Sequence, residues 1–240
     1  MRVILEVLDF FTPRFCTVCN VLLTSNTEFI CDSCKNSIEY LNEADIRNEY
    51  QRKFNFENFV DDYTSLYQFE EEGSLQKLVH ALKYNKKFKI GIYLGKELGY
   101  ARKDIFRSWD LDFIIPVPLY KLKKVERTFN QSLYIAKGVK SVINIPIENS
   151  IVLRKKNTVS QTTLSLEERK QNLNGAFLLR HKKKIESKNI LIVDDVITTG
   201  ATVREIAKIL KENGANKIFA ISVATPPFSH TVGSTNPENH

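Results

Sequence analysis

The sequence lacks long hydrophobic runs, and no stretch of about 18 apolar residues occurs in its 240 positions. A transmembrane helix is therefore not expected. The first 15 residues are apolar but interrupted by Glu6 and Asp9, and no small-residue cleavage site follows, so they make a poor signal peptide. Their apolar side chains recur at helical spacing, which predicts an amphipathic helix that packs on the body or on a partner. A cytoplasmic location is the default expectation.

Acidic residues are outnumbered. The chain has 28 Asp and Glu against 35 Lys and Arg, a formal net charge of +7. Basic side chains gather in residues 121–127, 154–156 and 180–188. Such clusters suit phosphate groups, either on a small ligand or along a nucleic acid. An ordinary solvated surface rich in lysine remains the alternative for each of them.

Cysteine is absent beyond position 34. Its four copies form two Cys-x2-Cys pairs, namely Cys16, Cys19, Cys31 and Cys34. Two such turns supply the four thiolates of a closed, tetrahedral zinc site, which predicts a structural and not a catalytic Zn²⁺. Disulfides are disfavoured in a cytoplasmic chain, and thioredoxin-like redox chemistry lacks its sequence context. A segment with so few apolar residues would need the metal in order to fold.

Short apolar runs alternate with helical patterns from residue 63 onward. Strands are expected at 63–69, 113–117, 151–153, 190–193 and 217–224, and helices at 73–84, 90–98, 129–142 and 202–213. Residues 39–62, rich in Glu, Asn and Asp, are interpreted as a connector. The alternation predicts an α/β fold, a parallel sheet flanked by helices, with ligands beyond the carboxyl ends of the strands. The expected domains are 1–45 (helix and zinc ribbon), 46–228 (the α/β domain) and 229–240 (a flexible tail).

One segment, residues 190–203, joins a buried strand to a helix through two acidic residues and a Thr/Gly-rich loop. The N–H groups of the loop and helix start, with the threonine hydroxyls, can hold a phosphate dianion. Gly200 permits the positive φ and close approach that such a site needs. Asp194 and Asp195 can accept hydrogen bonds from two sugar hydroxyls. The pattern therefore favours a phosphorylated ribose.

Other interpretations of this segment fit only in part. A receiver domain would need a further Asp on a later strand, and no Asp follows Asp195. A nucleotide-binding P-loop would need G-x4-G-K-[ST], whereas Gly91 and Gly95 have the wrong spacing and no hydroxyl follows Lys96. A purely structural strand–turn–helix would leave two adjacent carboxylates without a use, which is unfavourable at a buried strand end.

The segment resembles the loop with which type I phosphoribosyltransferases bind 5-phosphoribosyl 1-diphosphate (PRPP). Further blocks in the same order resemble the ComF family, as does the four-cysteine ribbon. These blocks are Pro116-Val-Pro118-Leu, Glu126-Arg127-Thr-Phe129-Asn130-Gln131, Arg154, Gln161-Thr-Thr-Leu164-Ser165, Arg169, Asn172 and Gly175-Ala-Phe177. The resemblance covers nearly all of residues 10–225. Thr128 departs from it, because the family usually has Gly there, and a threonine would be strained if that position needs a positive φ.

The resemblance implies roles for individual residues. Asp194, Asp195 and Arg127 are the catalytic candidates, with Arg127 gripping pyrophosphate by its planar fork. Residues 154–169 would form a loop that closes over the ligand. Magnesium would arrive with PRPP, held mainly by ligand oxygens and water. The full set expected to bind PRPP is Asp194, Asp195, Val196, Thr198, Thr199, Gly200, Ala201, Thr202, Lys121, Gln161 and Arg169.

Several functions agree with this resemblance. The expected function is that of a PRPP-binding protein in natural transformation, which handles incoming single-stranded DNA beside a helicase-like partner. If the protein is an active enzyme, it transfers phosphoribosyl from PRPP to an unknown acceptor. The alternative is a non-catalytic PRPP sensor or scaffold in nucleotide metabolism. Type I relatives are often dimers, so a homodimer is expected by analogy only.

Overall fold

The computed structural model describes residues 13–24, 27–85, 87–119, 128–155 and 175–227. The expected N-terminal helix and C-terminal tail lie outside these residues, as do Lys121, Arg127, Gln161 and Arg169. In the described part of the chain, no helix is long and apolar enough to cross a membrane.

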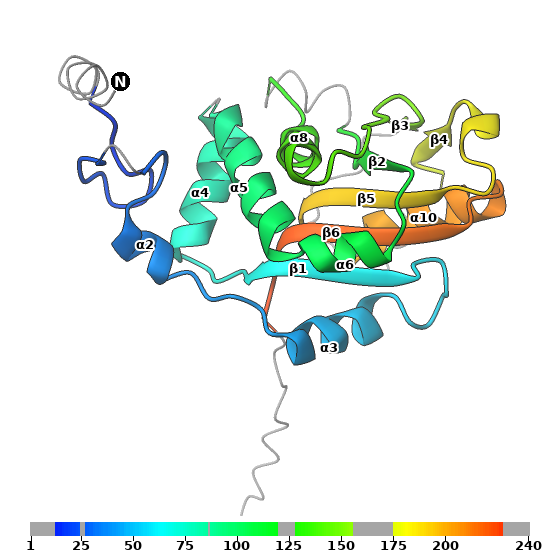
Figure 1. The fold of residues 1–240 in the computed structure, drawn as a ribbon, viewed down its shortest axis with the longest axis horizontal. Helices are drawn as coiled ribbons and strands as arrows, with labels where there is room; N and C mark the ends of the chain where they lie inside the picture. The colour runs from blue at the N-terminus through cyan, green and yellow to red at the C-terminus, as the bar shows by residue number, and fades with distance from the viewer. Residues whose placement is uncertain (1–12, 25–26, 86, 120–127, 156–174, 228–240) are drawn as a thin grey trace, which may run out of the picture.

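A four-stranded sheet in the order β1-β6-β5-β2 forms the centre of the molecule, and each neighbouring pair is parallel. Its strands are β1 (Asp62–Gln68), β2 (Phe113–Pro116), β5 (Asn189–Val196) and β6 (Lys217–Thr225). A separate antiparallel pair is formed by β3 (Val152–Arg154) and β4 (Phe177–Leu179). Figure 1 shows this pair beyond the β2 edge of the sheet. The predicted parallel α/β architecture is confirmed.

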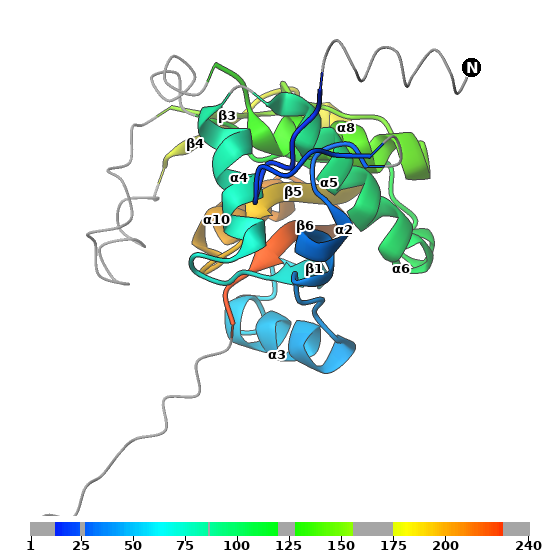
Figure 2. The same ribbon diagram turned by 90° about the vertical axis from the view of Figure 1, so that its left-hand side faces the viewer.

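Both faces of the sheet are covered, because successive strand residues point to opposite sides. Leu191 and Val193 of β5 pack into one apolar cluster, while Ile190 and Ile192 pack into the other. The first cluster contains residues of α4 (Ser74–Tyr84), α5 (Phe88–Ala101), α6 (Lys103–Ser108) and α8 (Gln131–Ile143). The second contains residues of α3 (Glu43–Lys53) and α10 (Ala201–Glu212). Figure 2 shows the sheet between α4 and α5 on one side and α3 on the other.

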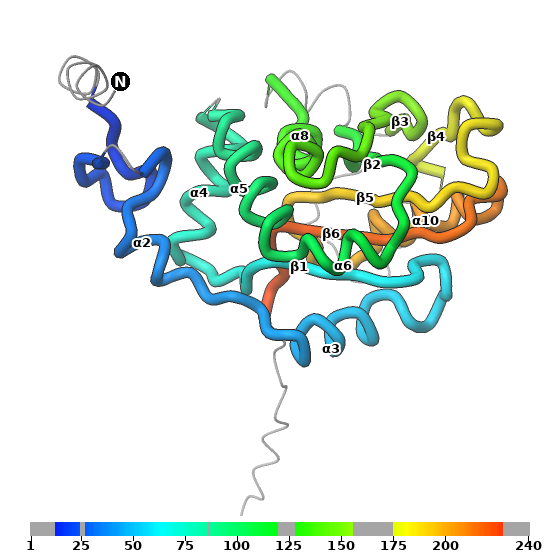
Figure 3. Tube along the Cα trace, viewed as in Figure 1, coloured from blue at the N-terminus to red at the C-terminus, as the bar shows by residue number. Residues whose placement is uncertain are grey.

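Helices α5 and α8 lie side by side along the first face (Figure 3). A Cβ built on Gly95 would lie 2.1 Å from the Ile135 carbonyl oxygen, and one on Gly138 would lie 2.2 Å from the Ile92 carbonyl oxygen. These glycines therefore let two helix backbones touch. Gly91 also packs against α8, since its Cβ would lie 2.9 Å from the Cβ of Tyr134. The Gly91–Gly95 spacing thus serves helix packing.

The connector expected at residues 39–62 is wrong in its middle, where α3 forms an eleven-residue helix. The Asn42 side chain caps this helix by accepting a hydrogen bond of 2.9 Å from the Asp45 N–H. Ile46, Tyr50 and Phe54 recur every four residues and face the core. The polar composition concealed this pattern, because charged side chains occupy buried positions between the apolar ones.

Candidate functional site

Strand β5 ends in the two adjacent carboxylates at the carboxyl edge of the sheet. Asp194 Oδ1 accepts hydrogen bonds of 2.9 Å from the Ser132 hydroxyl and 2.9 Å from the Asp195 N–H. Ser132 lies in the first turn of α8, and its hydrogen bond therefore joins the start of α8 to the end of β5. Both residues keep part of their surface exposed. Their oxygens can therefore accept further hydrogen bonds from a ligand.

Burial raises the pKa of Asp194 to about 7, and the neighbouring charge of Asp195 adds to the rise. The Asp195 N–H, the Ser132 hydroxyl and Lys83 oppose it, since each favours the ionised carboxylate. Asp194 consequently changes charge near neutral pH. A carboxyl group in this state can accept hydrogen bonds strongly above neutrality and weakly below it.

Lys83 reaches the same edge from the last turn of α4. Its Nζ lies 2.8 Å from Asp195 Oδ2, and its side chain is 22% exposed. The sequence analysis missed this residue, because Lys83 stands on the solvent side of an amphipathic pattern and 112 positions before its partner. No spacing rule connects the two residues. Only the parallel sheet brings α4 beside the end of β5.

The loop after β5 forms a small cavity of about 90 Å³, lined by Asp194 and residues 196–203. Gly200 precedes α10 with a φ of 74°, in the left-handed region that glycine tolerates. Most of the expected PRPP contacts meet here, with Asp195 beside the cavity. The cavity opens at the start of a twelve-residue helix, where backbone N–H groups and the helix dipole attract anions. Its lining includes Val196, Thr198, Thr199, Gly200, Ala201 and Thr202.

A larger cavity of about 800 Å³ lies on the β2 side of the carboxylates. Its lining combines the cations Arg154, Lys155 and Arg180 with the side chains of Asn130 and Tyr134. Burial lowers the pKa of the Arg154 guanidinium, and the Asp194 carboxylate opposes part of this shift. The four remaining candidates lie outside the described residues, and they are Lys121, Arg127, Gln161 and Arg169.

Thr128 has a φ of 63°, so the position where the ComF family usually has Gly does require the left-handed region. A β-branched residue is strained there. Next to it, the Asn130 amide donates to the Val117 carbonyl at 3.0 Å. This bond ties the start of α8 to the end of β2.

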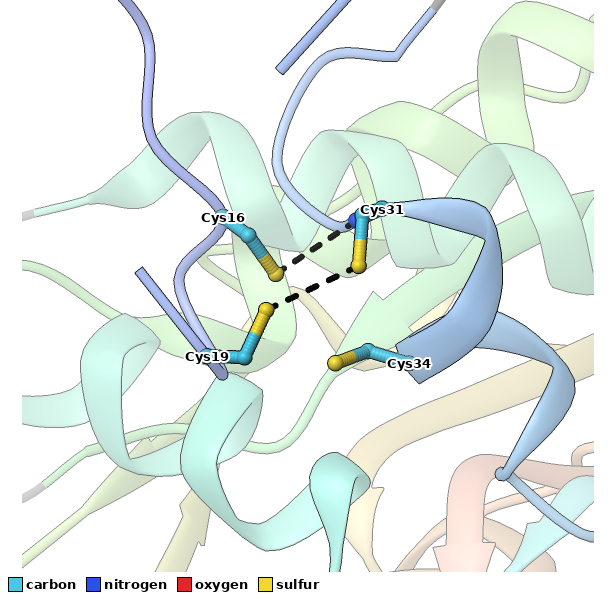
Figure 4. Close-up of side chains that lie close together, drawn as sticks. All are labelled: Cys16, Cys19, Cys31 and Cys34. Carbon is cyan, nitrogen blue, oxygen red and sulfur yellow. Dashed lines mark hydrogen bonds between the residues drawn. The ribbon is translucent and has the colours of Figure 1, made fainter. Parts of the chain in front are cut away.

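The four cysteines converge at one point, as Figure 4 shows. Their Sγ atoms all lie within 4.8 Å of one another. A tetrahedral zinc site with Zn–S bonds of about 2.3 Å sets sulfur–sulfur distances of about 3.8 Å. The Sγ atoms of Cys19 and Cys31 lie 3.7 Å apart. The cluster therefore has the size that a metal such as zinc requires.

Backbone hydrogen bonds favour the thiolate form of Cys16 within this cluster. Burial raises the pKa of the Cys16 thiol, but backbone N–H groups of Cys19, Cys31 and Val18 outweigh it and lower the pKa to about 6. Two of these N–H groups, from Val18 and Cys31, each lie 3.4 Å from Cys16 Sγ. Donors directed at a sulfur stabilise the thiolate, which is the form that binds metal.

Comparison with known proteins finds relatives by sequence and by structure. A family model described as a phosphoribosyl transferase domain matches residues 130–230. Competence protein F of Haemophilus influenzae is 37% identical over 148 residues, which are 60% of this chain and 65% of that protein. The DNA utilization protein YhgH of Escherichia coli K12 is 34% identical over 145 residues, 59% of this chain and 63% of that protein. The chain thus spans less than two thirds of the length of these curated relatives.

Among solved structures, a hypoxanthine phosphoribosyl transferase of Trypanosoma cruzi matches with a TM-score of 0.38 and 14% identity, over 57% of this chain and 74% of that one. A TM-score this low supports no conclusion about the present chain. The sequence relatives and the family model confirm the resemblance found in the sequence. Over about 60% of its length the chain is thus similar to competence protein F and YhgH, and its residues 130–230 are similar to a phosphoribosyl transferase domain.

Proposed function

We propose that this protein binds PRPP with Mg²⁺ at the carboxyl edge of the sheet and acts in natural transformation, in the handling of single-stranded DNA. The observation that carries the proposal is the continuous edge formed by Asp194, Asp195 and the loop cavity before α10. Sugar-binding carboxylates and a phosphate-sized anion site adjoin there. The names of the relatives, a competence protein and a DNA utilization protein, support the biological role. A cytoplasmic location and a homodimer belong to the same proposal.

Each part of the edge has a distinct task in this proposal. The ionised carboxylates of Asp194 and Asp195 accept hydrogen bonds from the two ribose hydroxyls. The N–H groups and hydroxyls of residues 198–202 hold the 5′-phosphate at the start of α10. Magnesium bound with the ligand would neutralise part of the diphosphate charge and would be held mainly by oxygens of the ligand and water. The protein's part is to bind and orient the ribose.

The larger cavity, with Arg154, Lys155 and Arg180, suits the diphosphate side of the ligand. In transfer, the bond from ribose C1 to the diphosphate oxygen breaks, a nucleophile bonds to C1, and pyrophosphate leaves with the electron pair. Fixed cations stabilise that developing charge. We assign Lys121 and Arg127 to pyrophosphate and Gln161 and Arg169 to a closing loop, as the resemblance implies.

The cysteine cluster fits a structural Zn²⁺ in this proposal, because four thiolates leave no coordination position open for a substrate. The cluster packs on α5 through an ion pair of 2.7 Å between Lys35 Nζ and Glu97 Oε2. The Phe29 and Tyr93 rings, 5.7 Å apart, add an apolar contact beside it. The metal would thus fix the N-terminal segment on the α/β body.

Pyrophosphate release separates an enzyme from a PRPP sensor. The zinc-loaded protein is incubated with PRPP, Mg²⁺ and a nucleotide-pool extract or a panel of nucleophiles, and pyrophosphate is measured. An enzyme releases pyrophosphate, and the variant Asp194→Asn/Asp195→Asn does not. PRPP binding without release over the whole panel supports the sensor, whereas neither binding nor release contradicts both.

Salt-dependent DNA binding tests the biological role. The 3-10 turn Lys182–Lys184 presents three exposed lysines, and their conversion to Glu is expected to weaken single-stranded DNA binding and to flatten its salt dependence. Conversion of the same three residues to Arg keeps the charge and is the matched control. Equal affinity of the Glu variant and the native chain would remove this turn from the DNA surface.

A further inference from the structure

A buried pair of opposite charges lies under the loop that follows β5. Glu49 and Lys53 of α3 are only 2% and 1% exposed, and Lys53 Nζ lies 2.6 Å from Glu49 Oε2. Burial of this depth is unfavourable for two ions unless further hydrogen bonds satisfy them. The partners of the pair therefore indicate what it does.

Lys53 is hydrogen bonded to the loop itself. Its Nζ donates to the Ile197 carbonyl oxygen at 2.6 Å and to the hydroxyl of Thr225, the last residue of β6. The Thr225 hydroxyl lies 3.0 Å from the same carbonyl and 3.1 Å from Glu49 Oε2, and can donate to one of them at a time. The charged pair is thus joined to the first residue after β5.

A second buried cation, Arg204 of α10, holds the next part of the loop. Arg204 is 7% exposed. Its Nη1 donates to the Thr199 carbonyl at 2.8 Å and to the Lys53 carbonyl at 2.6 Å. Gly200 lies against the same helix end, since a Cβ there would come within 2.9 Å of the Phe54 ring and 3.2 Å of Lys53 Cβ. Two alternate carbonyls of the loop are therefore held by two buried cations.

The direction of these carbonyls fixes the direction of the neighbouring amides. In a trans peptide the C=O of one residue and the N–H of the next point in opposite directions. When the Ile197 and Thr199 carbonyls point at Lys53 and Arg204, the N–H groups of Thr198 and Gly200 point away from these cations. An anion site in a loop depends on this alignment of N–H groups.

We propose that Glu49, Lys53 and Arg204 form a buried brace that holds residues 197–200 in their anion-binding conformation. Glu49 and Lys53 are thus positioning residues for PRPP, although they lie under the loop on a helix that precedes the phosphoribosyl transferase match. This inference rests on the proposed PRPP site. It adds that α3 determines how well that site is formed.

The direct test is calorimetric titration of PRPP with Mg²⁺ into the zinc-loaded chain and its variants, with a melting curve for each. Lys53→Met is expected to lower the affinity at least about tenfold. Glu49→Gln/Lys53→Met removes both charges, leaves no unpaired buried ion, and should lower it similarly. Arg52→Met is the matched control, because Arg52 also pairs with Glu49, at 2.7 Å, but its side chain is 43% exposed. Folded Lys53 variants that bind PRPP as the native chain does would overturn the brace.

A pH profile distinguishes positioning from general stability. Burial lowers the pKa of Lys53 to about 8, with Glu49 opposing and Arg52 adding to the shift. Among the described residues, the Tyr63 ring of β1 also faces the Lys53 ammonium, and the Arg204 guanidinium of α10 lies near it, bonded to the Lys53 carbonyl. Lys53 loses its charge between about pH 7.5 and about pH 9.5, and PRPP binding should weaken over this range. The free energy of unfolding should not fall over the same range, because the unfolded chain then binds more protons than the folded chain. Lys53→Met should lack this decline in affinity, and the same decline in the variant would contradict the brace.

The brace can fail separately from the PRPP site. If the native chain binds no PRPP, the proposed ligand is wrong, and hydrogen exchange of the amides of residues 198–201 then tests the brace in the unliganded chain. Faster exchange of these amides in Lys53→Met than in the native chain and in Arg52→Met supports the brace. Equal exchange in all three would overturn it.

Discussion

Asp194 sets the electrostatic balance of the site at the scale of single residues. Because its folded-state pKa is about 7, it binds a proton in the folded chain at pH values where the unfolded chain has released it. Its contribution to stability is present at low pH and is lost as the pH rises through about 7. The ionised form is the one that accepts ribose hydrogen bonds. Stability and ligand binding therefore respond to pH in opposite directions.

Asp194→Asn is expected to raise the free energy of unfolding at pH 8 by about 1–2 kcal/mol, because it removes a carboxylate from beside Asp195. The same change should weaken PRPP binding. Urea unfolding at pH 5 and pH 8 measures the first effect, and the gain should be smaller at pH 5. A loss of stability at pH 8 would contradict this description of the carboxyl pair.

Ser132→Ala tests the hydrogen bond that favours the ionised form of Asp194. Without the 2.9 Å bond from the hydroxyl, the pKa of Asp194 is expected to rise further. The midpoint of PRPP affinity against pH should then move upward. Ser141→Ala, later on the same helix, is the control, since its hydroxyl donates only to the Gly138 carbonyl. An unmoved midpoint in Ser132→Ala would exclude this role.

Gly95→Ala is expected to lower the free energy of unfolding by about 1–3 kcal/mol, because the new methyl group would enter the space of the Ile135 carbonyl oxygen and separate α5 from α8. Chemical denaturation measures the change. Lys96→Ala, at the neighbouring exposed position, is the control and should leave stability nearly unchanged. Equal stability of the two variants would show that the helices are not in such close contact.

At the scale of elements, the zinc ribbon is expected to depend on its metal. Metal analysis should find one Zn²⁺ per chain, and a chelator or Cys34→Ser should unfold the N-terminal segment and expose the face of α5 around Tyr93. Ser33→Ala, one position earlier, should keep the metal. Absence of zinc from freshly purified protein would overturn the assignment.

The elements differ in how far their sequences predicted them. β5 and β6 were found because buried parallel strands are continuous apolar runs, and α10 because Gly200 and Gly214 flank its pattern. Helix α3 was missed, since Glu49 and Lys53 occupy buried positions where an apolar pattern expects Leu or Ile. The hydrogen-bond partners that satisfy this buried pair lie in β6 and in the loop after β5, more than 140 positions away. A local pattern carries no information about such partners.

At the scale of the whole molecule, the parallel sheet gathers the site from distant segments. α4 brings Lys83, α8 brings Ser132 and β5 brings the two carboxylates, all to the edge where ligands bind in such sheets. The sequence predicted the carboxylates and the loop, because they form one contiguous motif. Lys83, Ser132 and the brace could not be predicted, since their roles exist only after the sheet has formed.

The most direct measurement is calorimetric titration of PRPP with Mg²⁺ into the zinc-loaded native protein, beside Asp194→Asn/Asp195→Asn. The matched control is Asp61→Asn/Asp62→Asn, which changes two adjacent aspartates at the start of β1, at the opposite edge of the sheet. The account predicts binding by the native chain and the control, and loss of binding in the Asp194/Asp195 variant. No binding by the folded native chain, or equal binding by all three, would contradict the PRPP site.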